Sequence, residues 1–309
     1  MTHAYAEKEQ TRTGRKEAAL TRQDRIFYTV INVIMVFLIL IVVIPILNVI
    51  ANSFSDGNAV ASGKVTLWPV DFSLQGYQTT FENQDIWLGY GNTIIYTIVG
   101  TLFNLALTLI AAWPLSRADL PARSPIMFFF AFTMLFNGGM IPTYLNVQEL
   151  GLINSRWCLI VLGGISIYNM IITRTFFQTT IPRDLVEAAQ LDGCSEIRFF
   201  FTIVLPLSKA VIAVIALYYA VYHWNAYFEA FLYLTRKELY PLQLILRQIL
   251  LENTITADTV LEADMAVNYN LVETMKYAVI LVACVPIWCV YPFVQKYFVQ
   301  GVMIGAIKG

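Results

Sequence analysis

The segment from Ile181 to Gly193 combines acidic, small and apolar residues in a pattern typical of a short docking helix. Pro182 suits a first helical position, and Gly193 suits the left-handed turn that ends a helix. Carboxylates near the positive end of a helix dipole are favourable and can meet cations on another protein. The candidate docking residues are Asp184, Leu185, Glu187, Ala188, Ala189, Leu191, Asp192 and Gly193. We expect this helix to dock in a groove on a soluble partner.

A second candidate site consists of aromatic and amide side chains. Tyr218, Tyr222, Asn225 and Glu229 recur at helical spacing, and Trp224 lies beside them. Aromatic faces stack on the C–H surfaces of sugars, and amides bind their hydroxyls, so the stripe could bind a sugar. The alternative is an interfacial belt, where Tyr and Trp are commonly enriched. Glu229 would repel a polyanionic sugar and therefore favours the belt if the sugar is acidic.

Patterns for enzymatic chemistry are absent from the sequence. The string from Gly57 to Val65 is one residue too long for a phosphate-binding loop, and Val65 replaces the required hydroxyl. The four cysteines and two histidines show no metal-ligand spacing. The 20 basic and 21 acidic residues offer no basic field for nucleic acid. We expect no enzymatic activity, no cofactor bound by this chain and no nucleic-acid partner.

The composition indicates that lipid surrounds the elements that position these residues. Of 309 residues, 58% are hydrophobic and 13% charged, and the mean hydropathy is +0.62. A spanning helix needs about 20 largely apolar residues. Six uncharged or nearly uncharged stretches predict an all-α membrane protein with six transmembrane helices, at about 27–50, 86–114, 124–147, 157–173, 203–222 and 277–295. The trimmed spans contain no Asp, Glu or His.

The distribution of Lys and Arg predicts the orientation of these spans. The first set of alternate loops, with both chain ends, holds 13 basic residues against 6 in the opposite set. The more basic set faces the cytoplasm. We therefore expect a cytoplasmic segment 1–26, a transmembrane domain 27–299 containing a cytoplasmic loop 174–202, and a cytoplasmic tail 300–309.

A longer motif contains the docking segment and carries a family resemblance. Glu187-Ala188-Ala189 is followed by Gly193 after three residues, and by Ile203, Leu205 and Pro206 after nine more. This string resembles the signature of permease subunits of binding-protein-dependent ABC importers. Further stretches look like the carbohydrate branch of that family, namely Gly138 to Tyr144, Leu150 to Leu152, Trp224-Asn225, Tyr240 to Leu244 and the tail Tyr291 to Gly309. The tail is similar to that of the second permease of importers for large or acidic oligosaccharides, including alginate and pectin fragments.

The resemblance implies a type I, maltose-type importer fold in the bacterial cytoplasmic (inner) membrane, with six spans. It also implies partners: a second, homologous permease, two ATP-binding subunits that hold ATP and Mg²⁺, an external sugar-binding protein and an oligosaccharide substrate. Residues 181–193 would couple to the ATPases, and Pro206 would mark the entry to the fifth span.

Two other classes of function fit the sequence less well. A secondary transporter driven by an ion gradient would need acidic or histidine relays inside the membrane. A membrane scaffold or channel would not explain the motif between residues 181 and 206.

Overall fold

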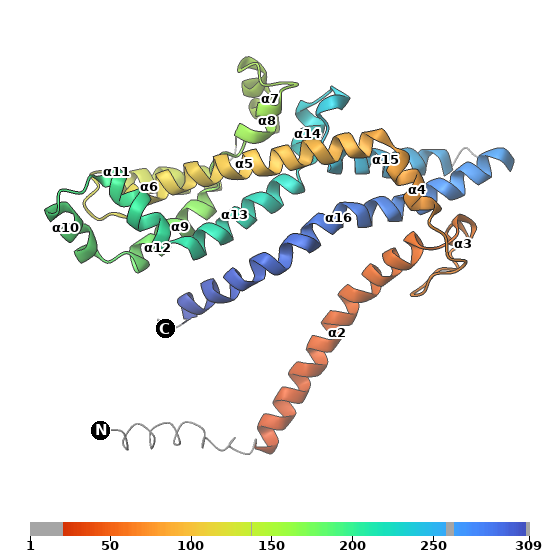
Figure 1. Ribbon diagram of the computed structural model, residues 1–309, viewed down its shortest axis with the longest axis horizontal. Coiled ribbons are helices and arrows are strands. Elements are labelled where there is room, and N and C mark those ends of the chain that lie inside the picture. The colour runs from red at the N-terminus through yellow and green to blue at the C-terminus, as the bar shows by residue number, and fades with distance from the viewer. Residues whose placement is uncertain (1–20, 137, 258–262, 307–309) are drawn as a thin grey trace.

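The computed structural model describes residues 21–136, 138–257 and 263–306, and shows an elongated bundle of helices from which one long helix near the N-terminus diverges (Figure 1). Most of the predicted N-terminal segment, residues 1–20, and the last three residues of the tail lie outside this part of the chain. No strand longer than the isolated bridge between Ser55 and Phe72 occurs among the described residues. The all-α prediction is confirmed.

Three described helices are long and apolar enough to cross a membrane on their own: α2, Arg22–Ser53; α5, Gln84–Ser116; and Val272–Pro292 within α16, Ala263–Ala306. They match the first, second and sixth predicted spans. Helix α2 begins with a capping box in which Thr21 and Asp24 exchange hydrogen bonds. Helices of this length exceed the roughly 30 Å hydrocarbon core, so part of each lies in the headgroups or is tilted.

Helix α2 stands away from the bundle along most of its length (Figure 1). Every residue from 22 to 47 is exposed. Only its last turn is buried, where Ala51 packs with Val60 of α3, Gly57–Ala61, and with Val65, beside Tyr277 of α16. The apolar surface of α2 therefore needs lipid or another protein to cover it.

Two further predicted spans are bent helix pairs. The third comprises α6, Arg123–Leu135, and α7, Met140–Glu149. The fifth comprises α11, Glu196–Phe199, the π-helical turn η1, Phe200–Val204, and α12, Leu205–Leu207, followed after an 83° bend by α13, Lys209–Trp224. Pro206 lacks the N–H that a regular α-helix requires, which favours an irregular turn here. The bend itself falls at Ser208.

The fourth predicted span, 157–173, is not one continuous helix. It is divided between α8, Arg156–Val161, and α9, Ile167–Thr180, and neither half is long enough to span. Gly163 has φ +72° at the break, a conformation that side-chain-bearing residues rarely adopt. Single spanning helices therefore number three among the described residues, or five if each bent pair counts as one.

Helix α5 forms the centre of the bundle because it packs against α13, α9, α15 and α8. Its buried polar side chains hold the chain that leads into α15, Leu242–Ala257: Asn92 Nδ2 donates to the Glu238 carbonyl at 2.8 Å, and Tyr96 donates to the Leu239 carbonyl at 2.8 Å. The remaining short helices are α4, Gln75–Glu82; α10, Arg183–Leu191; α14, Phe228–Tyr233; and the 3₁₀ turn η2, Lys237–Leu239. These contacts fix η2 and the start of α15 in the half of the bundle remote from α10 (Figure 1).

Candidate coupling and cargo sites

The docking helix predicted from the sequence is formed as α10. Pro182 is its N-cap, Asp192 its C-cap, and Gly193 follows with φ +72°. The Gly193 N–H donates to the Gln190 carbonyl and the Cys194 N–H to the Ala189 carbonyl, which closes the turn at the end of the helix. No residue of α10 is buried. The helix therefore protrudes from the end of the bundle (Figure 1).

The two faces of α10 differ in their contacts. Val186 and Ala189 pack against the buried core of the bundle. Leu191, in contrast, is 90% exposed, and Ile197 just beyond the turn is 73% exposed. Asp184, Leu185, Glu187, Ala188 and Asp192 are also exposed. A protruding helix with exposed leucine and carboxylates has the surface chemistry of a protein contact site.

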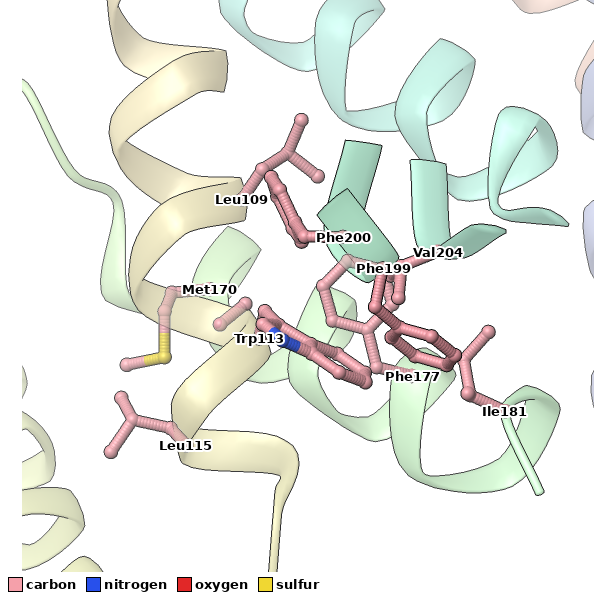
Figure 2. Packing of buried hydrophobic residues seen from close by; sticks show 10 residues of the cluster. Leu109, Trp113, Leu115, Met170, Phe177, Ile181, Phe199, Phe200 and Val204 are labelled. Carbon is pink, nitrogen blue, oxygen red and sulfur yellow. The ribbon is translucent and has the colours of Figure 1, made fainter. Parts of the chain in front are cut away.

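Trp113 lies at the centre of the buried cluster against which Val186 and Ala189 of α10 pack (Figure 2). Its ring centroid is 5.9 Å from that of Phe177 on α9 and 5.8 Å from that of Phe199 on α11. Leu109 and Val204 belong to the same buried cluster. Close-packed aromatic contacts of this kind transmit displacement because they leave little free volume. The core thus joins α10 to α5, α9 and the start of the fifth predicted span.

A groove of about 500 Å³, lined by both charged and apolar side chains, lies between α10 and the end of α5. Arg117 binds Asp119 at 2.7 Å and Glu196 at 3.0 Å. Gln190 of α10 donates to the same Glu196 carboxylate at 3.0 Å. The hydrogen bond from Arg117 lowers the pKa of Asp119 to about 2, and the one to Asp119 raises the pKa of Arg117. Sequence reasoning missed this ion-pair network because Arg117 and Glu196, the two residues that join its halves, are 79 residues apart.

Pro206 lies outside α10, within α12 directly before the bend at Ser208. It therefore does not share the exposed face of the docking helix.

The residues of the predicted sugar stripe separate in space. Helix α13 ends at Trp224, so Glu229 belongs to α14. The Tyr222 hydroxyl donates to Glu229 at 3.2 Å, and Tyr218 is 40% exposed. Trp224 is buried with its ring 6.3 Å from Tyr90 of α5.

Asn225, the C-cap of α13, lines a different cavity together with Tyr227, Gln243 and Arg247. Arg247 could not be predicted from local sequence, because α15 carries it to the aromatic residues from about twenty positions further along the chain.

His223 lies beside the predicted stripe in the sequence, but no separate role is predicted for it. Helix α13 extends beyond the predicted span and includes it, 1% exposed. Both ring nitrogens lack a hydrogen-bond partner among the described residues, and the imidazole packs directly on Gly100 of α5. Only a residue without a side chain fits at that close approach.

Comparison with known proteins identifies the fold and the family. Residues 86–304 match the family described as "Binding-protein-dependent transport system inner membrane component". The chain belongs to this family. It is thus a multi-pass permease of the bacterial inner membrane, and the resemblance seen in the motif from Glu187 to Pro206 is confirmed.

Two relatives from Bacillus subtilis (strain 168) are each 42% identical to this permease. The "Polygalacturonan/rhamnogalacturonan transport system permease protein YtcP" aligns over 93% of this chain and all of its own length. "Protein LplC" aligns over 87% of this chain and 90% of its own.

A solved structure, a bacterial ABC transporter involved in the import of the acidic polysaccharide alginate, has a chain that is 34% identical. The match covers 90% of this permease and 98% of that chain, with a TM-score of 0.81. The type I importer permease fold is confirmed by this similarity.

Proposed function

We propose that this permease is a non-catalytic membrane subunit of an ATP-driven oligosaccharide importer, and that α10 is the element through which ATPase motion enters it. The observation that carries the proposal is the division of α10 into two faces. Val186 and Ala189 pack against the core, whereas Leu191 and the carboxylates are exposed. Such a helix can follow a docked partner and displace the bundle.

The coupling residues have distinct parts in this mechanism. Asp184, Glu187 and Asp192 meet cations on the ATPase, while Leu185, Ala188 and Leu191 supply apolar contact. Gly193 permits the turn, and Ala189 anchors the helix beside Trp113. When ATP closes the paired ATPases, α10 moves with them and the core carries α5 and α9 from an inward-open to an outward-open arrangement.

The proposed topology retains six crossings. The helices α8 and α9 together form the fourth crossing, with Gly163 in the break; irregular backbone is tolerated at membrane depth where protein surrounds it. An even number of crossings places both termini on one side. The excess of basic residues on that side makes it the cytoplasm, where α10 also lies.

The proposed assembly contains a second, homologous permease, two ATP-binding subunits with ATP and Mg²⁺, and an external sugar-binding protein. The exposed length of α2 supports the presence of a neighbour, since another helix can bury that apolar surface. Oligosaccharide cargo is supported by the names of the relatives, which specify polygalacturonan, rhamnogalacturonan and alginate. Polygalacturonan and alginate are chains of uronic acids, so an acidic fragment is the favoured cargo.

The coupling role is tested by the double variant Glu187→Arg with Gly193→Pro in the assembled transporter. Charge reversal opposes docking, and proline cannot adopt the φ of +72°. We expect little ATPase to co-purify with the detergent-extracted permeases, or cargo-stimulated ATP hydrolysis to be lost. The matched control is Glu149→Arg, at the exposed end of α7. Normal stimulated hydrolysis in the double variant would remove the coupling role.

A further inference from the structure

Arg247 of α15 is held against two aromatic rings. Its guanidinium carbon is 4.8 Å from the centroid of Tyr227 and 5.6 Å from that of Phe231. A guanidinium at this distance from a ring face is attracted by the ring quadrupole. Because two rings hold it, this side chain loses less rotational freedom when a ligand binds than an unrestrained arginine would.

The positive charge of Arg247 is not neutralised within the described part of the chain. Among the described residues, no carboxylate forms an ion pair or a hydrogen bond with Arg247, and the residue is exposed. Other arginines differ: Arg117, Arg183 and Arg236 each pair with an acidic residue. The N–H groups of a guanidinium point outward in its plane, so contact with a ring face leaves those of Arg247 able to bind an oxyanion in a bidentate manner.

The guanidinium borders a cavity of about 500 Å³. Small-molecule sites commonly have volumes of roughly 300 to 1,000 Å³. The lining combines the amides of Asn225 and Gln243 with the ring of Tyr227 and with apolar side chains, including Leu246 and Ile280. Asn225 Nδ2 donates to the Val221 carbonyl at 2.8 Å, which leaves the Oδ1 atom to accept from a ligand.

This combination matches the chemistry of a sugar acid. The amides suit ring hydroxyls, the aromatic and aliphatic groups suit the C–H faces, and the guanidinium suits the carboxylate. Glu229 does not line the cavity and accepts a hydrogen bond from Tyr222. The repulsion that Glu229 would exert on an acidic sugar therefore acts outside this cavity.

The cavity also lies where cargo would arrive. Helices α14 and α15 are remote from α10 along the length of the bundle (Figure 1). If α10 faces the cytoplasm, the cavity belongs to the external half of the permease.

We propose that this cavity is a cargo subsite that binds one uronic acid unit, with Arg247 on the carboxylate and Asn225 and Gln243 on the hydroxyls. The inference rests on the proposed function and specifies its cargo as an acidic oligosaccharide. A lipid headgroup could also supply an oxyanion to Arg247, and the experiment separates the two sources.

The test uses the complete transporter with its binding protein, reconstituted in vesicles with ATP inside. Uptake is measured for trigalacturonate and for its fully methyl-esterified form, which retains the hydroxyls but lacks the charges. We expect Arg247→Gln to lower trigalacturonate uptake roughly tenfold at subsaturating concentration and to leave ester uptake unchanged, because a charge-assisted hydrogen bond is lost only with the acid. Arg247→Lys should have an intermediate effect. Arg236→Gln, which changes an exposed arginine already paired with Glu238, is the control.

Each other outcome has a defined meaning. Equal loss of acid and ester uptake would show that Arg247 acts through lipid or structure, and it would overturn the subsite. Unchanged uptake of both cargoes by Arg247→Gln would overturn it as well. Uptake of neutral oligosaccharides alone by the wild-type transporter would reject the acidic subsite and retain sugar import. If the wild-type transporter imports no oligosaccharide, the proposed function fails together with the subsite.

Discussion

Leu191 gives a quantitative test of the docking surface. The side chain is 90% exposed at the end of α10, although a leucine of this size gains free energy when a partner covers it. Leu191→Ala removes three carbon atoms, and full burial contributes about 0.8 kcal/mol for each, so the binding free energy should weaken by about 2 kcal/mol. This corresponds to roughly 30-fold weaker ATPase binding. Alanine is a strong helix former and preserves α10.

The assay titrates purified ATPase subunit into vesicles that contain the permease pair and measures the bound fraction. The thermal unfolding of the permease without ATPase should remain within about 0.5 kcal/mol of wild type, because the leucine makes little contact there. Leu150→Ala, which changes a 71% exposed leucine beside α7, is the matched control. ATPase affinity unaltered by Leu191→Ala, or lowered equally by Leu150→Ala, would refute docking through this face of α10.

Three further predictions concern packing and charge. Gly100→Ala places a methyl group against the buried His223 ring and should destabilise the permease by about 1 to 3 kcal/mol. Gly91→Ala on the same helix is the control, because its added methyl group meets open space. Thermal unfolding of both variants checks this, and equal melting temperatures would contradict it. Trp113→Ala should cost about 3 to 5 kcal/mol in unfolding free energy and also reduce coupled ATP hydrolysis; full coupling would contradict the role of the core. The pKa of Asp119 is lowered to about 2, so its stabilising contribution should be complete above about pH 4 and decline as pH falls toward 2. Asp119→Asn should flatten this part of a plot of unfolding free energy against pH. An unchanged plot would contradict the prediction.

The spans predicted from composition agree with the observed helices to different extents. Residues 27–50, 86–114 and 277–295 lie within continuous helices, because long uncharged stretches suffice to specify them. Residues 157–173 do not form one helix, since Gly163 and Gly164 permit a break that apolar content cannot reveal. The bends in the third and fifth predicted spans, around residues 138–139 and Ser208, likewise could not be predicted from apolar content.

Local sequence determined the class of the protein, the existence of α10 and its family. These properties depend on composition and on residues close in the chain: Pro182 and Gly193 limit the helix, and Glu187 to Pro206 carry the signature. Tertiary structure alone decided which face of α10 is anchored, that Trp113 joins it to the bundle, and that Arg247 meets Tyr227 beside a cavity. The physical reason is that side chains far apart in sequence become neighbours only through helix packing, which a one-dimensional pattern does not specify.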